Sequence, residues 1–393
     1  MSRATAHVPA PAPGAGGTRL FLTLAFLIAV FNLLGLVMVM SASSVVALDE
    51  YGSSWYFVQR QAAWAAVGTV ALVITAKLDY HHWRRFAGPF VLVALLLLTV
   101  VLPIGTGTRG ATRWIGVGPL TFQPSELAKL ALLVWCADLL ARRAAYTHNL
   151  RATLRPVIVV LAAMATLVML EPNLGTTIVL AAIALTMCYV GGVPLGPLAR
   201  WSAFGIGAAT ALALAAPYRR ARVLAFLDPW ADPMDKGYQN IQSMVGLAEG
   251  GLIGKGLGAG TAKWGFLPLA HSDFIFAVIG EELGLVGATA VVGLFVLLAV
   301  VGIRIALHAP DRFGLLLAVG VTSWYCVQAF VNIGAVIGIL PITGVPLPFI
   351  SAGGSSLVFG MAGAGLLLSV ARQAPDAVPG ARPREPAMST SEP

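Results

Sequence analysis

A few charged, amide and hydroxyl side chains interrupt the long apolar runs of this chain, in stretches at 109–129, 171–176, 263–284 and 328–356. Ionisable groups at membrane depth are costly to bury, so they are the first candidates for function. None of these stretches has the His and Cys spacing of a metal site or the pattern of a nucleophile triad. Together they predict a cavity lined by carboxylates, cations and amides, which suits a large amphiphilic substrate with an anionic head.

The first stretch joins a basic turn to a helix start, and its candidate substrate-binding residues are Arg109, Arg113, Trp114, Glu126 and Lys129. Pro124 suits the first turn of a helix, and Glu126 is favoured at the positive end of the helix dipole. Glu126 and Lys129 are three residues apart, so they share a helix face. The alternative is that they form only a helix cap and an internal ion pair.

The third stretch contains Lys263, His271 and Asp273 as candidate site residues. Asp273 precedes an apolar run, where desolvation raises the pKa of a carboxyl group and nearby cations lower it. A simple helix N-cap is the alternative role for this residue. Glu281 and Glu282 follow about two turns later, roughly 12 Å deeper along a helix. At that depth they must be paired, protonated or solvated, and structural pairing is favoured for at least one of them.

The remaining two stretches place polar groups at apparent turns. Glu171 ends an apolar run, although a tight turn alone explains the Pro, Asn and Gly that follow it. The amides of Gln328 and Asn332 have a plain alternative role in joining helix to helix. Ser351 and Ser355 belong to a segment dense in Pro and Gly. Irregular backbone at membrane depth persists only where it is buried in protein or lines a cavity, so we include all five residues in the candidate site.

The composition indicates that these residues are positioned by elements that lie in a membrane. Hydrophobic residues make up 58% of the chain and charged residues only 11%, far below the roughly 25% typical of soluble domains. Lipid must therefore be the solvent for most of the surface. The net charge of +8 is spread in short blocks between apolar runs, which indicates loops near anionic lipid and not a nucleic-acid-binding face. The three cysteines lie inside apolar runs and are interpreted as small hydrophobic residues.

The apolar runs predict an all-α, polytopic membrane protein with about ten transmembrane helices. The runs lie near 20–42, 58–77, 86–104, 124–141, 154–171, 174–192, 201–217, 274–303, 313–340 and 352–371. They form a single membrane domain over 20–371. The segments at 1–19 and 372–393 are rich in Pro, Ala, Gly and Ser and are expected to be disordered tails.

Basic residues between the runs predict the orientation. The positive-inside rule places both termini and the loops around Arg84, Arg142 and Arg312 in the cytoplasm. The long stretch 218–273, between the seventh and eighth spans, is then external, and a loop of this length is usually functional. Arg109 and Arg113 would also face outward, against the rule, so they need another reason.

With these motifs in order, the chain resembles the SEDS family of peptidoglycan polymerases over about residues 20–371. The matching motifs are Arg113-Trp114-Ile115, Gln123-Pro124-Ser125-Glu126-Leu127-Ala128-Lys129, Phe226-Leu227-Asp228-Pro229-Trp230, Gly237-Tyr238-Gln239 with Gln242-Ser243, His271-Ser272-Asp273-Phe274-Ile275-Phe276, Glu281-Glu282-Leu283-Gly284, and Leu347-Pro348-Phe349-Ile350-Ser351 with Gly353-Gly354-Ser355-Ser356. The run from Val37 to Ser44 and the Glu-Glu-Leu-Gly motif favour the division branch of the family over its elongation branch.

The resemblance implies a ten-helix fold and glycosyl transfer on lipid II, the undecaprenyl-pyrophosphate-linked disaccharide pentapeptide. The family's essential Asp falls on Asp273, expected to be the general base, and its characteristic Arg, Glu and Lys fall on Arg113, Glu126 and Lys129. His271 is then a positioning group. The implied partners are a class B penicillin-binding protein, which is a monofunctional transpeptidase, and membrane proteins of the divisome. The implied location is the bacterial cytoplasmic membrane at the division septum.

Several alternatives remain open. An elongation polymerase and a lipid II flippase share the substrate and the cavity, although a transporter favours paired inverted repeats, and none is found. A scaffold that only recruits the crosslinking enzyme is the third alternative. No metal-binding residues are assigned, and a divalent cation (Mg²⁺ or Mn²⁺) is the one cofactor considered. Leu269, Ser272, Asn173 and Ala352 depart from the family pattern. Asn173 weakens any cation site there, and Ala352 weakens the expectation of sugar stacking.

Overall fold

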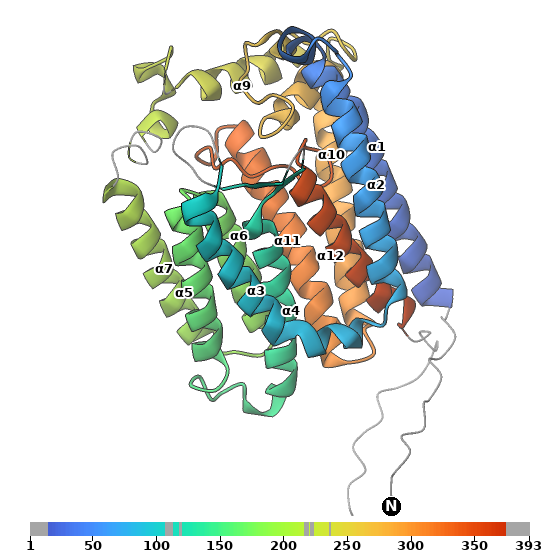
Figure 1. The fold of residues 1–393 in the computed structure, drawn as a ribbon, viewed down its shortest axis with the longest axis vertical. Coiled ribbons are helices and arrows are strands. Elements are labelled where there is room, and N and C mark those ends of the chain that lie inside the picture. Colours follow the sequence, from blue (N-terminus) through green and yellow to red (C-terminus); the bar gives the residue numbers. More distant parts are fainter. Residues whose placement is uncertain are drawn as a thin grey trace, which may run out of the picture.

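A computed structural model describes residues 15–106, 113–117, 120–215, 220, 224–235 and 237–374 of the chain. Arg109, a predicted substrate-binding residue, lies outside the described residues. Figure 1 shows a bundle of long helices with α9 and neighbouring loops across one end. The elements are α1 (Ala15–Tyr51), α2 (Tyr56–Lys77), η1 (Tyr80–His82), α3 (Trp83–Ile104), β1 (Ile115–Val117), β2 (Leu120–Phe122), α4 (Pro124–Arg142), η2 (Ala144–Tyr146), α5 (Leu154–Leu170), α6 (Leu174–Val190), α7 (Leu195–Ala215), η3 (Pro229–Ala231), α9 (Tyr238–Gly250), η4 (Ala262–Trp264), α10 (Ile275–Leu307), α11 (Arg312–Val336) and α12 (Gly354–Arg372).

The predicted helical membrane architecture is confirmed. Among the described residues, six helices are long and apolar enough to cross a membrane, namely α1, α2, α3, α10, α11 and α12. Helices α5 and α6 are also apolar but have 17 residues each, about 25 Å at 1.5 Å per residue. Helix α4 carries charged residues along its length, including Glu126, Lys129 and Asp138. The total of ten spans stays a prediction.

Small residues allow the helices to approach closely. A β-carbon on Gly365 of α12 would lie 1.9 Å from the Thr75 hydroxyl of α2, and one on Gly68 would lie 2.6 Å from the Met361 sulfur. Lipid gives no hydrophobic drive for helix association, so such close backbone packing carries much of the attraction between helices. Helix α11 lies among α4, α6, α10 and α12 and buries Trp324 almost completely.

The end of the bundle opposite α9 is where α1 begins and α12 ends, and we call it the terminal end (Figure 1). A β-carbon on Gly17 would lie 2.9 Å from the carbonyl oxygen of Ala371, so the two helix ends are in contact. The described chain thus starts and finishes at one end, as an even number of crossings requires. Residues 15–19, expected to belong to a disordered tail, are instead the first residues of α1, where Gly17 contacts the end of α12.

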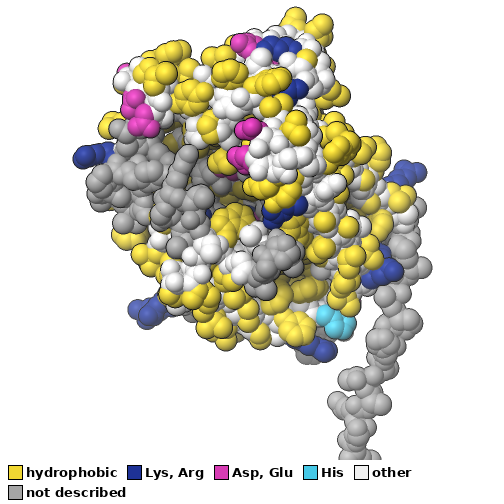
Figure 2. All heavy atoms as spheres, turned by 45° about the horizontal axis from the view of Figure 1, so that its top comes forward, with side chains coloured by type: hydrophobic (Ala, Val, Ile, Leu, Met, Phe, Trp, Pro, Cys, Tyr) yellow, Lys and Arg dark blue, Asp and Glu magenta, His cyan; other side chains and the backbone are white. Residues whose placement is uncertain are grey.

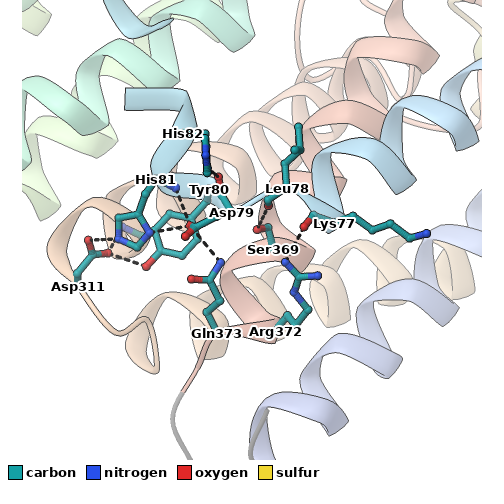
Figure 3. A network of polar contacts seen from close by, with 11 residues as sticks. Lys77, Leu78, Asp79, Tyr80, His81, His82, Asp311, Ser369, Arg372 and Gln373 are labelled. Atoms are coloured by element: carbon teal, nitrogen blue, oxygen red, sulfur yellow. Dashed lines mark hydrogen bonds and ion pairs between the residues drawn. The ribbon is translucent and has the colours of Figure 1, made fainter. Parts of the chain in front are cut away.

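A polar network closes the terminal end (Figure 3). The His81 ring lies between two carboxylates, with Nδ1 2.7 Å from Asp79 Oδ1 and Nε2 3.0 Å from Asp311 Oδ2. Tyr80 donates its hydroxyl to Asp311 at 2.9 Å, and Gln373 donates to Asp79 at 3.3 Å. These contacts join the loop after α2 to the start of α11 and to the end of α12.

The α9 end is built from loops and one small hairpin. Strands β1 and β2 pair antiparallel, with Ile115 opposite Phe122 and Gly116 opposite Thr121. The sequence did not predict this hairpin, whose strands have three residues each. The hairpin is attached to α12, because Ser355 donates its hydroxyl to the carbonyl oxygen of Thr121 and accepts from the backbone N–H of Gln123.

Candidate active site

A cavity of ≈ 1430 Å³ opens at the α9 end, between the last turns of α1 and the loop 262–274. Figure 2 looks toward this end and shows a hollow bordered by hydrophobic, basic and acidic side chains. Arg113, His271 and Asp273 are the predicted site residues that line the cavity. Asp49, Glu50, Tyr51, Phe57 and Gln239 also line it and were not predicted. The Asp49-Glu50 pair just after the first apolar run was the available signal for this wall.

The backbone around Asp273 is fixed at three consecutive carbonyl groups. The carbonyl oxygen of His271 accepts from the N–H of Ala352 at 2.9 Å, and that of Ser272 accepts from the Ser351 hydroxyl at 2.6 Å. The carbonyl oxygen of Asp273 accepts from Asn332 Nδ2 at 2.8 Å. These bonds hold the carboxylate in one place while it faces the cavity, as a catalytic group requires.

The alternative role of Asp273 as a helix N-cap is wrong. Helix α10 begins at Ile275, and its N-cap residue is Phe274, which makes no side-chain cap hydrogen bond. The Asp273 carboxylate accepts instead from the hydroxyl of Ser272 at 3.0 Å. Its position therefore needs another explanation than helix capping.

Arg113 lies on the same side of the cavity as Asp273. A β-carbon on Gly344 would lie 3.5 Å from Asp273 Oδ2 and 3.9 Å from Arg113 Nη1, so both groups border this glycine. The guanidinium is anchored from behind, because Nε donates to the carbonyl oxygen of Glu171 at 2.8 Å and Nη2 donates to that of Pro172. These hydrogen bonds explain why an arginine is placed at the predicted outer face, which the positive-inside rule does not.

Glu171 lies behind this anchor, fully buried, and does not line the cavity. Neither carboxylate oxygen has a hydrogen-bond partner among the described residues, and the same holds for the hydroxyl of Thr343 and for Asn332 Oδ1. Buried polar atoms are nearly always hydrogen-bonded, so these atoms are exceptions in this part of the protein. The buried Glu171 side chain thus lies behind the Arg113 anchor without a hydrogen-bond donor from the part of the chain that the structure describes.

Glu126 and Lys129 form a buried ion pair below the cavity. Lys129 Nζ is 2.8 Å from Glu126 Oε2, and the two side chains are 1% and 2% exposed. The ammonium also donates to Gln328 Oε1 at 2.8 Å, and Gln328 Nε2 donates to the carbonyl oxygen of Pro346 at 2.9 Å. Trp324 Nε1 completes the group with a 2.7 Å bond to Gln328. This geometry matches the alternative of an internal ion pair, which here supports the loop 341–353.

The loop 341–353 is held by the other predicted polar residues. Asn332 Nδ2 donates to the carbonyl oxygen of Val345 as well as to that of Asp273. The Ser351 hydroxyl accepts from the N–H of Leu347 at 2.8 Å. Gln328, Asn332 and Ser351 therefore position the cavity wall without lining it, whereas Ser355 holds the hairpin. The predicted role of all four in substrate binding stays a prediction.

His271 and Lys263 differ in their relation to the cavity. The His271 ring packs on Phe57 with 4.4 Å between ring centroids, and burial lowers the pKa of His271 to about 4. The imidazole is therefore neutral near pH 7. Lys263 donates its ammonium to the carbonyl oxygen of Gly258 in its own loop and does not line the cavity. Trp114 lies beside Arg113, where its backbone pairs with Thr106.

Fold and cavity together define a multi-pass membrane protein with a polar cavity at one end of a helical bundle. The family model described as a cell cycle protein, covering FtsW, RodA and SpoVE, matches residues 21–375, so the chain belongs to this family. A probable peptidoglycan glycosyltransferase FtsW from Geobacter metallireducens is 40% identical over 338 residues, which are 86% of this chain and 90% of the relative. The resemblance to the family of FtsW and RodA is thereby confirmed.

Two solved structures share the fold. A chain from a peptidoglycan synthase complex, described as coordinating polymerization and crosslinking, has a TM-score of 0.74 and 33% identity and covers 89% of this chain and 97% of that one. The rod shape determining protein RodA of Thermus thermophilus has a TM-score of 0.65 and 29% identity, with 89% and 96% covered.

Proposed function

We propose that this chain is a peptidoglycan glycosyltransferase that polymerises lipid II into glycan strands for septal synthesis in cell division. The observation that carries the proposal is the placement of Asp273, which three backbone hydrogen bonds hold at a large cavity beside Arg113. The identity is 40% to a relative named FtsW and 29% to the solved RodA, which favours division over elongation.

In the proposed reaction Asp273 accepts the proton of the 4-hydroxyl group on the acceptor sugar. The deprotonating oxygen attacks the anomeric carbon of the donor, and a new glycosidic bond forms. The bond from that carbon to the pyrophosphate oxygen breaks, and undecaprenyl pyrophosphate leaves with the electron pair. Positioning of the two sugars and stabilisation of the leaving group supply most of the reduction in barrier.

Arg113 is the proposed cation for the leaving pyrophosphate, because guanidinium and phosphate oxygens form strong charge-assisted hydrogen bonds. A divalent cation such as Mg²⁺ or Mn²⁺, when bound, would add charge stabilisation at the same oxygens. The described residues contain no group of three or more His, Cys, Asp or Glu that could hold a metal ion. Such a cation would therefore depend on substrate oxygens together with one cavity carboxylate, as Mg²⁺ sites commonly do.

We propose that the α9 end faces outward from the bacterial cytoplasmic membrane and that both termini are cytoplasmic. The charge pattern supports this orientation, and the meeting of α1 and α12 supports a shared side for the termini. A cysteine introduced as Asp235→Cys should react with an impermeant reagent applied to intact cells. Reaction only after the cells are opened would reverse the orientation.

A class B penicillin-binding protein is the proposed partner, together with divisome membrane proteins. The chain contains no Ser-x-x-Lys motif with which to crosslink peptides itself. The similar solved chain comes from a complex described as coordinating polymerization and crosslinking, which supports an assembly of the two activities.

Incubation of the purified protein with lipid II, followed by analysis of glycan chain length, tests the function. We expect polymer, and more of it when the transpeptidase is co-purified. Movement of lipid II across vesicles without any polymer would support the flippase alternative. If the protein binds its partner but neither polymerises nor moves lipid II, only the alternative of a recruiting scaffold would remain.

A further inference from the structure

Two adjacent carboxylates near the start of α10, Glu281 and Glu282, are not used by the proposed reaction. Their exposed fractions are 0% and 1%, and neither lines the cavity. Burying two neighbouring carboxylates is expensive unless each has good hydrogen-bond donors. The structure supplies those donors from two segments on different walls of the cavity.

Glu281 binds the loop that leads into one wall. Its Oε1 accepts from Lys255 Nζ at 2.8 Å, from the N–H of Thr261 at 2.6 Å and from the Thr261 hydroxyl at 2.7 Å. Its Oε2 accepts from the N–H of Ala262 at 3.2 Å. Ala262 is itself a cavity residue, and the wall continues from it to Asp273.

Glu282 binds the other wall. Both of its carboxylate oxygens lie within hydrogen-bond distance of the Ser41 hydroxyl, at 2.7 and 2.6 Å. Ser41 belongs to α1, and the residues that follow it, Ala42, Val45 and Val46, line the cavity. Two consecutive residues of one helix thus connect to two separate segments that line the same cavity.

A break in α10 places these carboxylates rigidly. Gly284 has φ 68° and ψ −167°, so the helical hydrogen-bond pattern is interrupted there. The loop after α9 replaces the missing bonds: the N–H groups of Lys255 and Gly256 donate to the carbonyl oxygens of Glu281 and Glu282, both at 3.0 Å.

The loop after α9 also accepts hydrogen bonds from the residues of α10 that follow the break. The N–H groups of Leu285 and Val286 donate to the carbonyl oxygens of Gly251 and Leu252, at 2.9 and 3.1 Å. A β-carbon on Gly254 would lie 2.2 Å from the carbonyl oxygen of Glu282, so only glycine permits this contact. The loop is therefore packed directly against the helix backbone at the carboxylate pair.

We propose that Glu281 and Glu282 are positioning residues that set the spacing between the two walls of the cavity. Glu281 fixes the 255–262 loop and Glu282 fixes the end of α1, both relative to one rigid point of α10. The consequence for catalysis rests on the proposed function, because wall spacing determines how donor and acceptor sugars meet.

The two carboxylates should respond differently to the same conservative change. Glu282 accepts from a single hydroxyl, so Glu282→Gln keeps an acceptor for Ser41. Glu281 uses both oxygens and shares Lys255 with Glu249, so Glu281→Gln turns an NH₂ group toward donors and loses one of the two ion pairs of Lys255. Glu282→Leu and Ser41→Ala both remove the α1 link, from opposite sides.

The test measures the distance between spin labels at Leu48→Cys and Trp264→Cys, which are 56% and 63% exposed and line the cavity from α1 and from η4. Single-label samples identify any signal from the native cysteines. We expect one narrow distance distribution for the native carboxylate pair and for Glu282→Gln. Glu281→Gln, Glu282→Leu and Ser41→Ala should give a shifted or broadened distribution.

Kinetics on the unlabelled chain provide the second readout. Misplacing a reacting group by about 1 Å can cost roughly 100-fold in rate, so we expect a fall in kcat of about 10- to 100-fold for Glu281→Gln and Glu282→Leu. Glu282→Gln should stay within about threefold. Asp138→Asn is the matched control, since Asp138 is also buried and ion-paired, with Arg84 and Arg142. It should lower the Tm without changing the label distance or kcat.

Unchanged label distances in both Glu281→Gln and Ser41→Ala would overturn the positioning proposal, whatever their activity. If Glu281→Gln does not fold, Thr261→Val removes one donor and, with Ser41→Ala, decides the same question. Absence of polymer from the native chain would contradict the proposed function and leave the distance result standing, so the two failures are distinguishable.

Discussion

The α9 end and the terminal end of the bundle use the same residue types in opposite ways. At the terminal end, Asp79, His81 and Asp311 contact one another or their neighbours and close the space between three segments (Figure 3). At the α9 end, Asp273 and Arg113 border an open cavity, and the buried Glu171 carboxylate has no hydrogen-bond partner among the described residues. A carboxylate joins segments where the space is closed and borders a volume large enough for a ligand where the space is open.

The sharpest test compares one carboxylate from each end. Asp273→Asn should lower the rate of polymerisation by roughly 10²–10⁴-fold, because an amide cannot accept the proton. Its Tm should barely change, because no helix cap is lost and the Asn oxygen still accepts from Ser272. Asp311→Asn should do the reverse, with a stability loss of about 1 kcal/mol from a weakened cap and network and a rate within twofold. Near-normal polymer from Asp273→Asn would contradict both the contrast between the two ends and the proposed mechanism.

Variants of the buried Glu126–Lys129 ion pair below the cavity can show whether the pair binds substrate or only supports the loop 341–353. Lys129→Met leaves Glu126 charged and unpaired, which should destabilise the protein by roughly 3–5 kcal/mol. Adding Glu126→Gln should restore most of the stability. Thermal unfolding and lipid II polymerisation are then measured on the double variant. A stable but inactive double variant would show that the pair acts on substrate, whereas an active one would confirm that it only supports the loop above it.

The two ends should also lose stability in different pH ranges. The pKa of His271 is about 4, below its ordinary 6.5, so the native state binds fewer protons than the unfolded state between these values. Stability should therefore fall as pH falls from about 6.5 toward 4, by up to about 3 kcal/mol, and His271→Asn should abolish this dependence. Thermal unfolding in detergent across this range is the measurement. A flat profile for the native protein would show that His271 is not held neutral.

Asp79, at the terminal end, should affect stability in a lower pH range than His271. Burial raises the pKa of this carboxyl, but hydrogen bonds from His81 and Gln373 outweigh it, and the pKa is lowered overall. Its contribution to stability is present above its ordinary pKa and disappears as pH falls further. In the same pH series, Asp79→Asn should change only the portion below about pH 4, where the His271 effect is already complete.

The sequence by itself determined that lipid surrounds most of the chain and that its apolar runs form helices. With so many hydrophobic and so few charged residues, each apolar run had to become a helix, because lipid offers no partner for backbone polar groups. It also selected Asp273, whose place before an apolar run and within a specific motif was visible in the chain. The hairpin and the helical residues 15–19 were missed because both depend on contacts with α12, which are distant in sequence.

Only the tertiary structure decided which polar residues meet the cavity. Arg113, His271 and Asp273 line it, whereas Glu126, Lys129, Gln328, Asn332 and Ser351 lie behind it as a support. Both groups are polar or charged residues from the same stretches between or within apolar runs, so no local pattern distinguishes them. The paired Glu281 and Glu282 show why: their partners are 20 to 26 and 241 residues away, and only folding brings Thr261, Lys255 and Ser41 to them. A side chain's role here is set by whether its neighbours leave space for a ligand, and that space exists only once the helices have packed.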